Sequence, residues 1–279
     1  MKKYLLLLLF PVSVLAQDDL LNEIDTVSTE KSKVESAFKG LKIVNLESTK
    51  LAAKGDLYFI VAHRFGSIKD GFEGFYGLDN ANTQIKFVYG LTNWFTVSGA
   101  RSELAYDFSG KFLIKNQERG GFPVAIAGFG SLAINNTLKE SLYPKMTFEN
   151  RLIYVSQILI SRKFSQNLSL EVVPTFFHEN FVLDDNQENS QLAVGLGGRY
   201  KFAKRWSLNI DYAAHLNRAS ESIYKNPLAI GFDLETGGHV FQMLFTNAQA
   251  INEAGFLGQT SGDWSKGEIA FGFNLYRVF

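Results

Sequence analysis

Residues 190–216 read SQLAVGLGGRYKFAKRWSLNIDYAAHL, and this stretch decides the fold. From Leu192 to Phe202 every second residue is apolar or glycine, whereas the residues between them are small, polar or charged. The same alternation resumes at Trp206, after the short connection 203–205. A period of two that is interrupted by a tight turn predicts two antiparallel strands whose sheet has one apolar face.

The alternation continues over most of the chain. Short connections at 92–93, 165–167, 203–205 and 237–238 contrast with long polar ones such as 67–83 and 248–264. Short turns on one rim and long loops on the other, joined by strands of about 9–11 residues, are typical of an outer-membrane barrel. We therefore predict an all-β fold, a transmembrane antiparallel up-and-down β-barrel of about twelve strands, at roughly 55–66, 83–91, 94–104, 107–117, 121–133, 147–163, 168–178, 190–202, 206–216, 227–236, 239–248 and 266–279.

Alternation alone does not separate this barrel from a soluble periplasmic β-sandwich, in which the charged face would be the outside. The end of the chain favours the barrel. It finishes on Phe279 with apolar residues at alternate positions before it, as bacterial outer-membrane strands do. This end resembles the signal that the barrel-insertion machinery reads, so we expect that machinery and outer-membrane lipid as partners. Arg277 departs from the pattern, because its parity directs it at lipid.

The N-terminus has a different character. Residues 1–16, MKKYLLLLLFPVSVLA, combine two lysines, an apolar run and a small residue before the expected cleavage site, which predicts a secretory signal peptide. Residues 17–54 are more polar, and we interpret them as a periplasmic leader or a plug within the lumen, with a short strand at 38–46. A mobile tail is an equally good interpretation of residues 17–35. Residues 55–279 form the predicted barrel.

The composition excludes several classes of protein. The 28 Lys and Arg residues equal the 28 Asp and Glu residues, which argues against a nucleic-acid-binding protein. The chain has no Cys, so disulfides, thiolate metal sites and Cys nucleophiles are absent. Its 25 Phe and 24 Gly residues suit an outer-membrane barrel.

Parity also predicts which side chains line the lumen. Acidic and basic candidates are nearly balanced, so we expect them to pair across strands rather than to make a pore selective for one sign of charge. Ile153, Val155, Leu159, Val173 and Phe177 point inward as well, which favours a plug or an apolar ligand over an open aqueous channel. The lumen-lining candidates are Arg64, Lys86, Lys111, Lys115, Glu149, Arg151, Lys163, Glu171, Arg199, Lys201, Asp211, His215, Asp233, Glu235 and Glu268.

No arrangement of residues predicts catalysis. A barrel lipase needs a Ser nucleophile beside a His base, yet none of His63, His178, His215 and His239 has a Ser two residues later. The best acid–base pair, His178 and Glu179, consists of strand neighbours that point to opposite faces. We expect no enzyme activity, catalytic residue, cofactor or metal site.

Three stretches resemble an uncharacterised family of outer-membrane β-barrel proteins of diderm bacteria, known as a domain of unknown function. They are KGDLYFIVAHRFG at 54–66, TGGHVFQ at 236–242 with Thr246-Asn247, and GFNLYRVF at 272–279. The resemblance spans residue 37 to the end. It implies a barrel in the cell outer membrane and assigns no reaction or substrate. His63-Arg64 and 239–242 are its family-like polar positions.

These observations support two hypotheses of function. The first is passive passage, or binding, of a small solute. The second is a non-conducting structural or surface-interaction barrel that uses its long extracellular loops, 67–83, 179–190 and 249–265.

Overall fold

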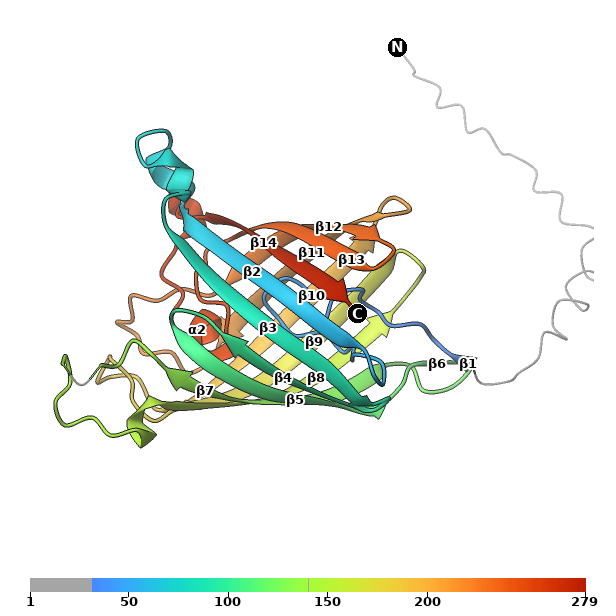
Figure 1. Ribbon diagram of the computed structural model, residues 1–279, viewed down its shortest axis with the longest axis horizontal. Coiled ribbons are helices and arrows are strands. Elements are labelled where there is room, and N and C mark those ends of the chain that lie inside the picture. Colours follow the sequence, from blue (N-terminus) through green and yellow to red (C-terminus); the bar gives the residue numbers. More distant parts are fainter. Residues whose placement is uncertain (1–31, 140) are drawn as a thin grey trace, which may run out of the picture.

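The computed structural model describes residues 32–139 and 141–279. These residues form a closed barrel of twelve antiparallel strands, in which each strand pairs with its neighbours along the chain and β14 (Ala270–Val278) closes against β2 (Leu57–Ser67) (Figure 1). The prediction of a twelve-strand up-and-down barrel is confirmed. The remaining wall strands are β3 (Ala81–Thr92), β4 (Phe95–Arg101), β5 (Ala105–Lys115), β7 (Ala125–Asn135), β8 (Leu152–Lys163), β9 (Leu168–Glu179), β10 (Ser190–Lys201), β11 (Trp206–His215), β12 (Leu228–Thr236) and β13 (His239–Thr246).

Smaller elements lie at the two rims. A two-residue strand, β1 (Ser32–Lys33), pairs with β6 (Glu118–Arg119) outside the wall. The long loops carry the short helices η1 (Ile68–Asp70), η2 (Phe75–Gly77), η3 (Glu149–Arg151), α2 (Glu253–Gly258) and η4 (Trp264–Lys266). No helix among the described residues has the length and hydropathy that spanning a membrane requires.

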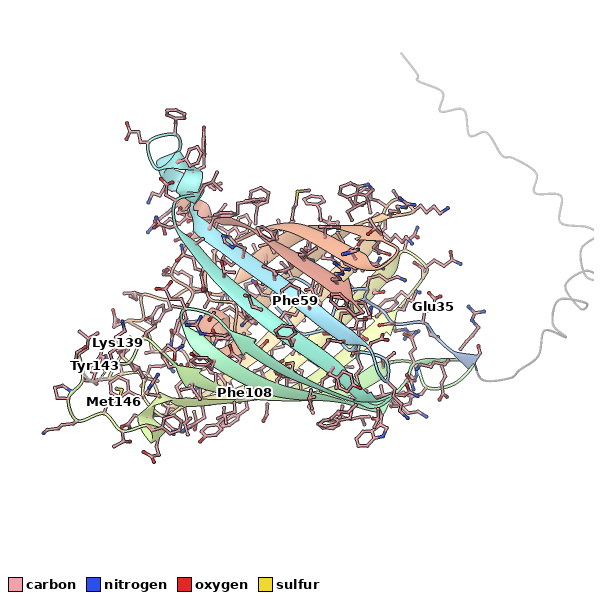
Figure 2. The ribbon with its side chains drawn as sticks, in the orientation of Figure 1. Glu35, Phe59, Phe108, Lys139, Tyr143 and Met146 are labelled. Carbon is pink, nitrogen blue, oxygen red and sulfur yellow. The ribbon has the colours of Figure 1, made fainter. Side chains whose placement is uncertain are left out.

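The apolar face of the strands is the outer face. On β10, Leu192 and Leu196 are 48% and 52% exposed, whereas Gln191 and Ala193 are 1% and 2% exposed. Phe108 on β5 stands on the same outer surface, 54% exposed (Figure 2). A barrel that spans lipid presents an apolar band on its outside around a polar interior. Its hydrogen-bond ladder is closed, so no strand edge is left unpaired in the hydrocarbon.

The two rims differ as the loop lengths predict. Residues 202–205 and 237–238 make short turns at one rim, here called the short-turn rim. Figure 2 places Tyr143 and Met146 of a long loop at the opposite end from Glu35. In outer-membrane barrels short turns face the periplasm and long loops the exterior. Both barrel ends, Leu57 and Val278, lie at the short-turn rim, as an even strand number requires.

Several predicted boundaries are wrong. The strand expected at 147–163 begins only at Leu152, because residues 149–151 turn as a 3-10 helix. The strand expected from 266 begins at Ala270, after η4. Residues 38–46 form no strand, and the one bridge there joins Lys42 to Glu47. The predicted signal peptide, 1–16, and residues 17–31 of the predicted leader lie outside the described residues.

Leu196, at the centre of β10, tests which medium meets the outer face. We expect Leu196→Arg to reduce the free energy of unfolding by about 2–4 kcal/mol, as a cation does at a bilayer midplane. Leu183→Arg, in the loop between β9 and β10, is the matched control, since Leu183 is 60% exposed in a polar loop. Urea titration of the protein folded into lipid vesicles measures both variants. Equal, small effects of the two substitutions would show that water meets β10.

Candidate functional site in the barrel lumen

The lumen is occupied by a part of the chain that precedes the wall. Residues 36–54, here called the inner segment, enter and leave at the short-turn rim, where Val34 N donates to Gln117 O at 2.9 Å and Gly55 N donates to Gly90 O at 2.8 Å. Between these points the chain rises into the barrel and turns back, with Ile43 N donating to Leu46 O at 2.8 Å. The segment is irregular, so its peptide groups need partners from the wall.

Asp211 of β11 binds the tip of the inner segment. Its Oδ2 accepts hydrogen bonds from the backbone N–H groups of Val44, Asn45 and Leu46, at 3.0, 2.7 and 2.9 Å. Asp211 is 3% exposed. A buried carboxylate that accepts several N–H groups is stabilised by charge-assisted hydrogen bonds, so the tip and Asp211 satisfy each other.

Lys111 of β5 binds the two arms of the segment. Its Nζ donates to the carbonyl oxygens of Leu41, Ser48 and Lys50, at 3.0, 2.8 and 3.2 Å. Three strands further round the barrel, Glu171 of β9 accepts a hydrogen bond from Thr49 N at 2.9 Å. The wall thus supplies a donor and an acceptor for the returning chain.

Strands near the closure of the barrel complete the contacts. Gln242 of β13 donates to Ile43 O at 2.7 Å, and Asn274 of β14 donates to Val44 O at 3.3 Å. Arg64 of β2 donates to the side chain of Asn45 at 3.2 Å and to that of Asn274 at 2.9 Å. These bonds hold the tip from strands two to four places round the barrel from β11, which carries Asp211.

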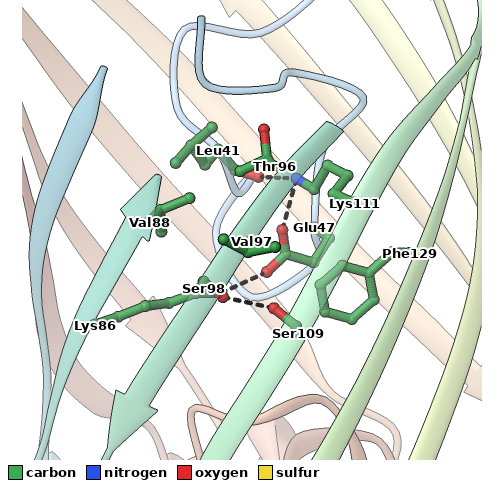
Figure 3. Close-up of a pocket in the computed structure, with 10 residues that line it drawn as sticks. All are labelled: Leu41, Glu47, Lys86, Val88, Thr96, Val97, Ser98, Ser109, Lys111 and Phe129. Carbon is green, nitrogen blue, oxygen red and sulfur yellow. Dashed lines mark hydrogen bonds and ion pairs between the residues drawn. The ribbon is translucent and has the colours of Figure 1, made fainter. Parts of the chain in front are cut away.

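Glu47 is the charged centre of the inner segment (Figure 3). Its carboxylate lies 2.7 Å from Lys111 Nζ and 3.2 Å from Lys86 Nζ, and 3.5 Å from Lys42 Nζ. Burial acts to raise the pKa of Glu47, but Lys111, Lys86 and Lys42 outweigh burial and hold the pKa well below its ordinary value. The carboxylate is therefore ionised and fixed between barrel and segment.

Small residues in the wall make room for the tip. Gly195 and Gly197 of β10 and Gly231 of β12 face the lumen, where a Cβ on each would lie within 2.7 Å of Leu46, 2.2 Å of Ile43 and 3.1 Å of Val44. These glycines let aliphatic side chains reach the backbone of the wall. This fit supports a position of the inner segment in which its tip packs against β10 and β12.

A loop from the other rim meets the inner segment. Residues 251–258, including α2, are buried inside the long-loop rim. Lys42 Nζ lies 2.5 Å from Glu253 Oε1 of α2. Burial acts to lower the pKa of Lys42, yet Glu253 and Glu47 outweigh it and raise that pKa. Phe256 and Leu257 join Phe38 and Leu46 in one apolar cluster with the inward-facing wall residues Ile153, Val155, Leu159, Val173 and Phe177.

The lumen keeps little free space. The cavity beside Glu47, which Lys86, Ser98 and Lys111 also line, measures about 20 Å³ (Figure 3). A single water needs roughly 10–15 Å³. The cavity beside Glu47 therefore has room for about one water.

The candidate residues fall into three groups. The largest group is buried within the lumen or points into it: Arg64, Lys86, Lys111, Glu171, Arg199, Asp211, His215 and Asp233. A second group lies at or near the short-turn rim. Lys163 pairs there with Glu35, Lys115 with Glu118, and Glu235 with Arg199 of the first group, and Lys201 ends β10.

The third group corrects the prediction. Glu149 is exposed in η3, and Arg151 donates to Asn135 O at 2.8 Å within the same loop region. Glu268 pairs with Lys69 at 2.8 Å in the loops of the long-loop rim. These three residues precede their strands rather than lie on them, because the strands begin at Leu152 and Ala270.

Sequence reasoning missed Glu47 and Gln242, the first because it lies in a polar stretch without periodicity. The inward apolar residues of β8 and β9 were the available signal that something fills the lumen. Within the described residues, no group of three His, Asp or Glu side chains is arranged to hold a metal ion.

Comparison with known proteins rests on the same part of the chain. Residues 38–279, which include most of the inner segment and the whole wall, match the family model described as "Membrane bound beta barrel domain (DUF5777)". The chain belongs to this family. The match confirms the predicted family resemblance and a wall that contacts lipid. A search of curated proteins finds no match to the sequence.

Solved structures share the fold of this family member. The KdgM porin in complex with disordered oligogalacturonate is 7% identical, with a TM-score of 0.50 over 80% of this chain and 99% of that one. The NanC porin is 10% identical, with a TM-score of 0.50 over 80% of this chain and 98% of that one. The fold is thus that of outer-membrane porins, and family and fold together support the predicted location in the outer membrane.

The ion cluster around Glu47 predicts a defined pH dependence. Because the folded pKa of Glu47 is lowered, its contribution to stability is full above the unfolded pKa of about 4.3 and is lost as the pH falls through the folded pKa. We expect the free energy of unfolding of the wild type to exceed that of Glu47→Gln by about 3–5 kcal/mol at neutral pH, since the variant leaves buried lysines uncompensated.

Calorimetric unfolding of both proteins over the acid range measures this difference. It should stay constant down to about pH 5 and shrink below about pH 4.3. The other carboxylates are common to both proteins and cancel. A difference that already disappears near neutral pH would contradict the ion cluster.

Proposed function

We propose that this protein is a gated outer-membrane pore for a small solute and that the inner segment is its plug. The observation that carries the proposal is that the lumen is filled by a tethered segment and not by the wall. Wall positions opposite the tip are glycines, and the segment is bound by side chains such as Asp211 and Lys111. Withdrawal of the segment breaks these bonds but none of the strand ladders.

The geometry supports withdrawal toward the periplasm. Both ends of the inner segment lie at the short-turn rim, so it can leave without passing through the barrel. The Lys42–Glu253 pair joins the segment to α2, and its loss would free the loop that closes the other rim. A withdrawn segment leaves a twelve-strand lumen, which is wider than the eight-strand case that side chains alone can fill. We propose no catalytic step, and we propose that Phe279 serves recognition by the insertion machinery.

A non-conducting surface-interaction barrel is the second candidate. It is favoured by apolar residues at the tips of long loops, where Phe72 is 82% exposed and Ile223 is 75% exposed. Such a protein keeps its inner segment in place permanently. Conductance therefore separates the two functions.

A disulfide lock tests whether the inner segment is the plug. The chain has no Cys, so Val44→Cys with Gly231→Cys forms a unique pair. A Cβ on residue 231 lies 3.1 Å from Val44 Cγ2, which suits a disulfide whose Cβ atoms are about 3.5–4.5 Å apart. In planar bilayers we expect the oxidised protein to be silent and the reduced protein to show channel openings.

The single variants Val44→Cys and Gly231→Cys are the controls, and their currents should not respond to reduction. Equal conductance of the oxidised and reduced double variant would show that ions bypass the inner segment. Silence of both forms, and of the variant that follows, would support the surface-interaction barrel instead.

Charge reversal at Glu47 tests the gate from the other direction. Glu47→Lys places a fourth cation among Lys42, Lys86 and Lys111. We expect this substitution to destabilise the closed state relative to the open state by about 3 kcal/mol, which raises the open fraction about a hundredfold. Glu73→Lys, the same change of charge at an exposed loop position, is the control and should conduct as wild type does.

A further inference from the structure

The lumen wall recognises the peptide groups of the inner segment. Besides the carboxylate of Glu47, Lys111 binds the backbone carbonyl oxygens of Leu41, Ser48 and Lys50. Gln242 likewise donates to the carbonyl of Ile43. Every peptide offers such carbonyl groups, so these contacts do not depend on the sequence of the segment.

Acceptors on the wall bind the N–H groups of the same stretch. Asp211 accepts from the amides of Val44, Asn45 and Leu46, and Glu171 accepts from that of Thr49. The wall therefore presents both donors and acceptors to one run of main chain. This alternation matches a peptide, in which each residue carries one N–H and one carbonyl.

Two further features select among peptides. Gly195, Gly197 and Gly231 open shallow positions that receive the aliphatic side chains of the tip. Lys86 and Lys111 hold a carboxylate, which the segment supplies as Glu47 at 3.2 and 2.7 Å. A free peptide can supply that carboxylate from a side chain or from its own C-terminus.

We propose that the lumen wall is a binding site for short peptides that carry aliphatic side chains and a carboxylate, and that the inner segment is a tethered mimic of this solute. The inference deepens the proposed function, because the site becomes available only when the segment withdraws. An oligosaccharide fits less well, since its hydroxyl groups do not reproduce consecutive amides directed at Asp211.

Competition between solute and segment follows from shared contacts. A peptide that occupies Asp211 and Lys111 excludes residues 41–49 from the same positions. Binding therefore shifts the population toward the withdrawn state, and the solute opens its own path. The gate needs no separate effector site.

Peptide binding to the full-length protein in detergent tests the proposal. The probe is a fluorescent decapeptide with the sequence of residues 41–50, LKIVNLESTK, followed by anisotropy. We expect Glu47→Lys protein, whose wall is vacated, to bind it at least about tenfold more tightly than wild type, whose wall is occupied. With both peptides amidated at the C-terminus, the matched peptide LKIVNLQSTK should bind at least about tenfold more weakly, because it then lacks a carboxylate. A malto-oligosaccharide should not displace the probe.

The disulfide lock gives a control within one molecule. Val44→Cys and Gly231→Cys are added to the Glu47→Lys protein, and the oxidised form should exclude the probe until reduction restores binding. A folding defect cannot produce that reversal. Equal binding of the two peptides, displacement by the oligosaccharide, or binding to the oxidised form would overturn the peptide site.

Conductance of the same Glu47→Lys protein separates the two proposals. Current without preferential peptide binding overturns the solute class and leaves the pore intact. Peptide binding with no current supports the peptide site and overturns passage.

Discussion

Peptide groups removed from water must find hydrogen-bond partners, and this constraint governs the whole molecule. The wall meets it by closing twelve strands on themselves through the β14–β2 pairing. The inner segment has no ladder of its own. It meets the same constraint by using Asp211, Lys111 and Glu171 of the wall as partners. The ionic interior of the barrel is thus explained by the backbone that it surrounds.

The interior charges acquire their meaning from this arrangement. A nearly balanced set of acids and bases is a poor design for a pore selective for one sign of charge. It is a good design for a wall that holds a main chain, because amides need acceptors and carbonyls need donors. Glu47 adds the one segment carboxylate that draws Lys86 and Lys111 together. Its lowered pKa keeps that contact ionic at neutral pH.

Local patterns in the sequence predict the strands of the wall but not the position of the inner segment. Leu192 and Gln191 take opposite faces because strand parity is a property of neighbouring residues, so all twelve strands could be predicted. Glu149 and Glu268 were misplaced because loop helices delay the start of two strands. The contact between Val44 and Asp211 joins residues 167 positions apart on an irregular segment, and no periodicity encodes it. The inward apolar side chains of β8 and β9 indicated that something fills the lumen but did not identify it.

The short link between the inner segment and the wall has a quantitative consequence. Lys54 is followed within three residues by Leu57, the first residue of β2, so the segment cannot diffuse away from the mouth of the barrel. A flexible tether of this kind gives an effective concentration on the order of millimolar. A free molecule that competes for the wall must therefore reach a comparable concentration or bind the wall more tightly than the inner segment does. Reclosure after each opening is consequently an intramolecular event, and its rate is independent of how much protein the membrane contains.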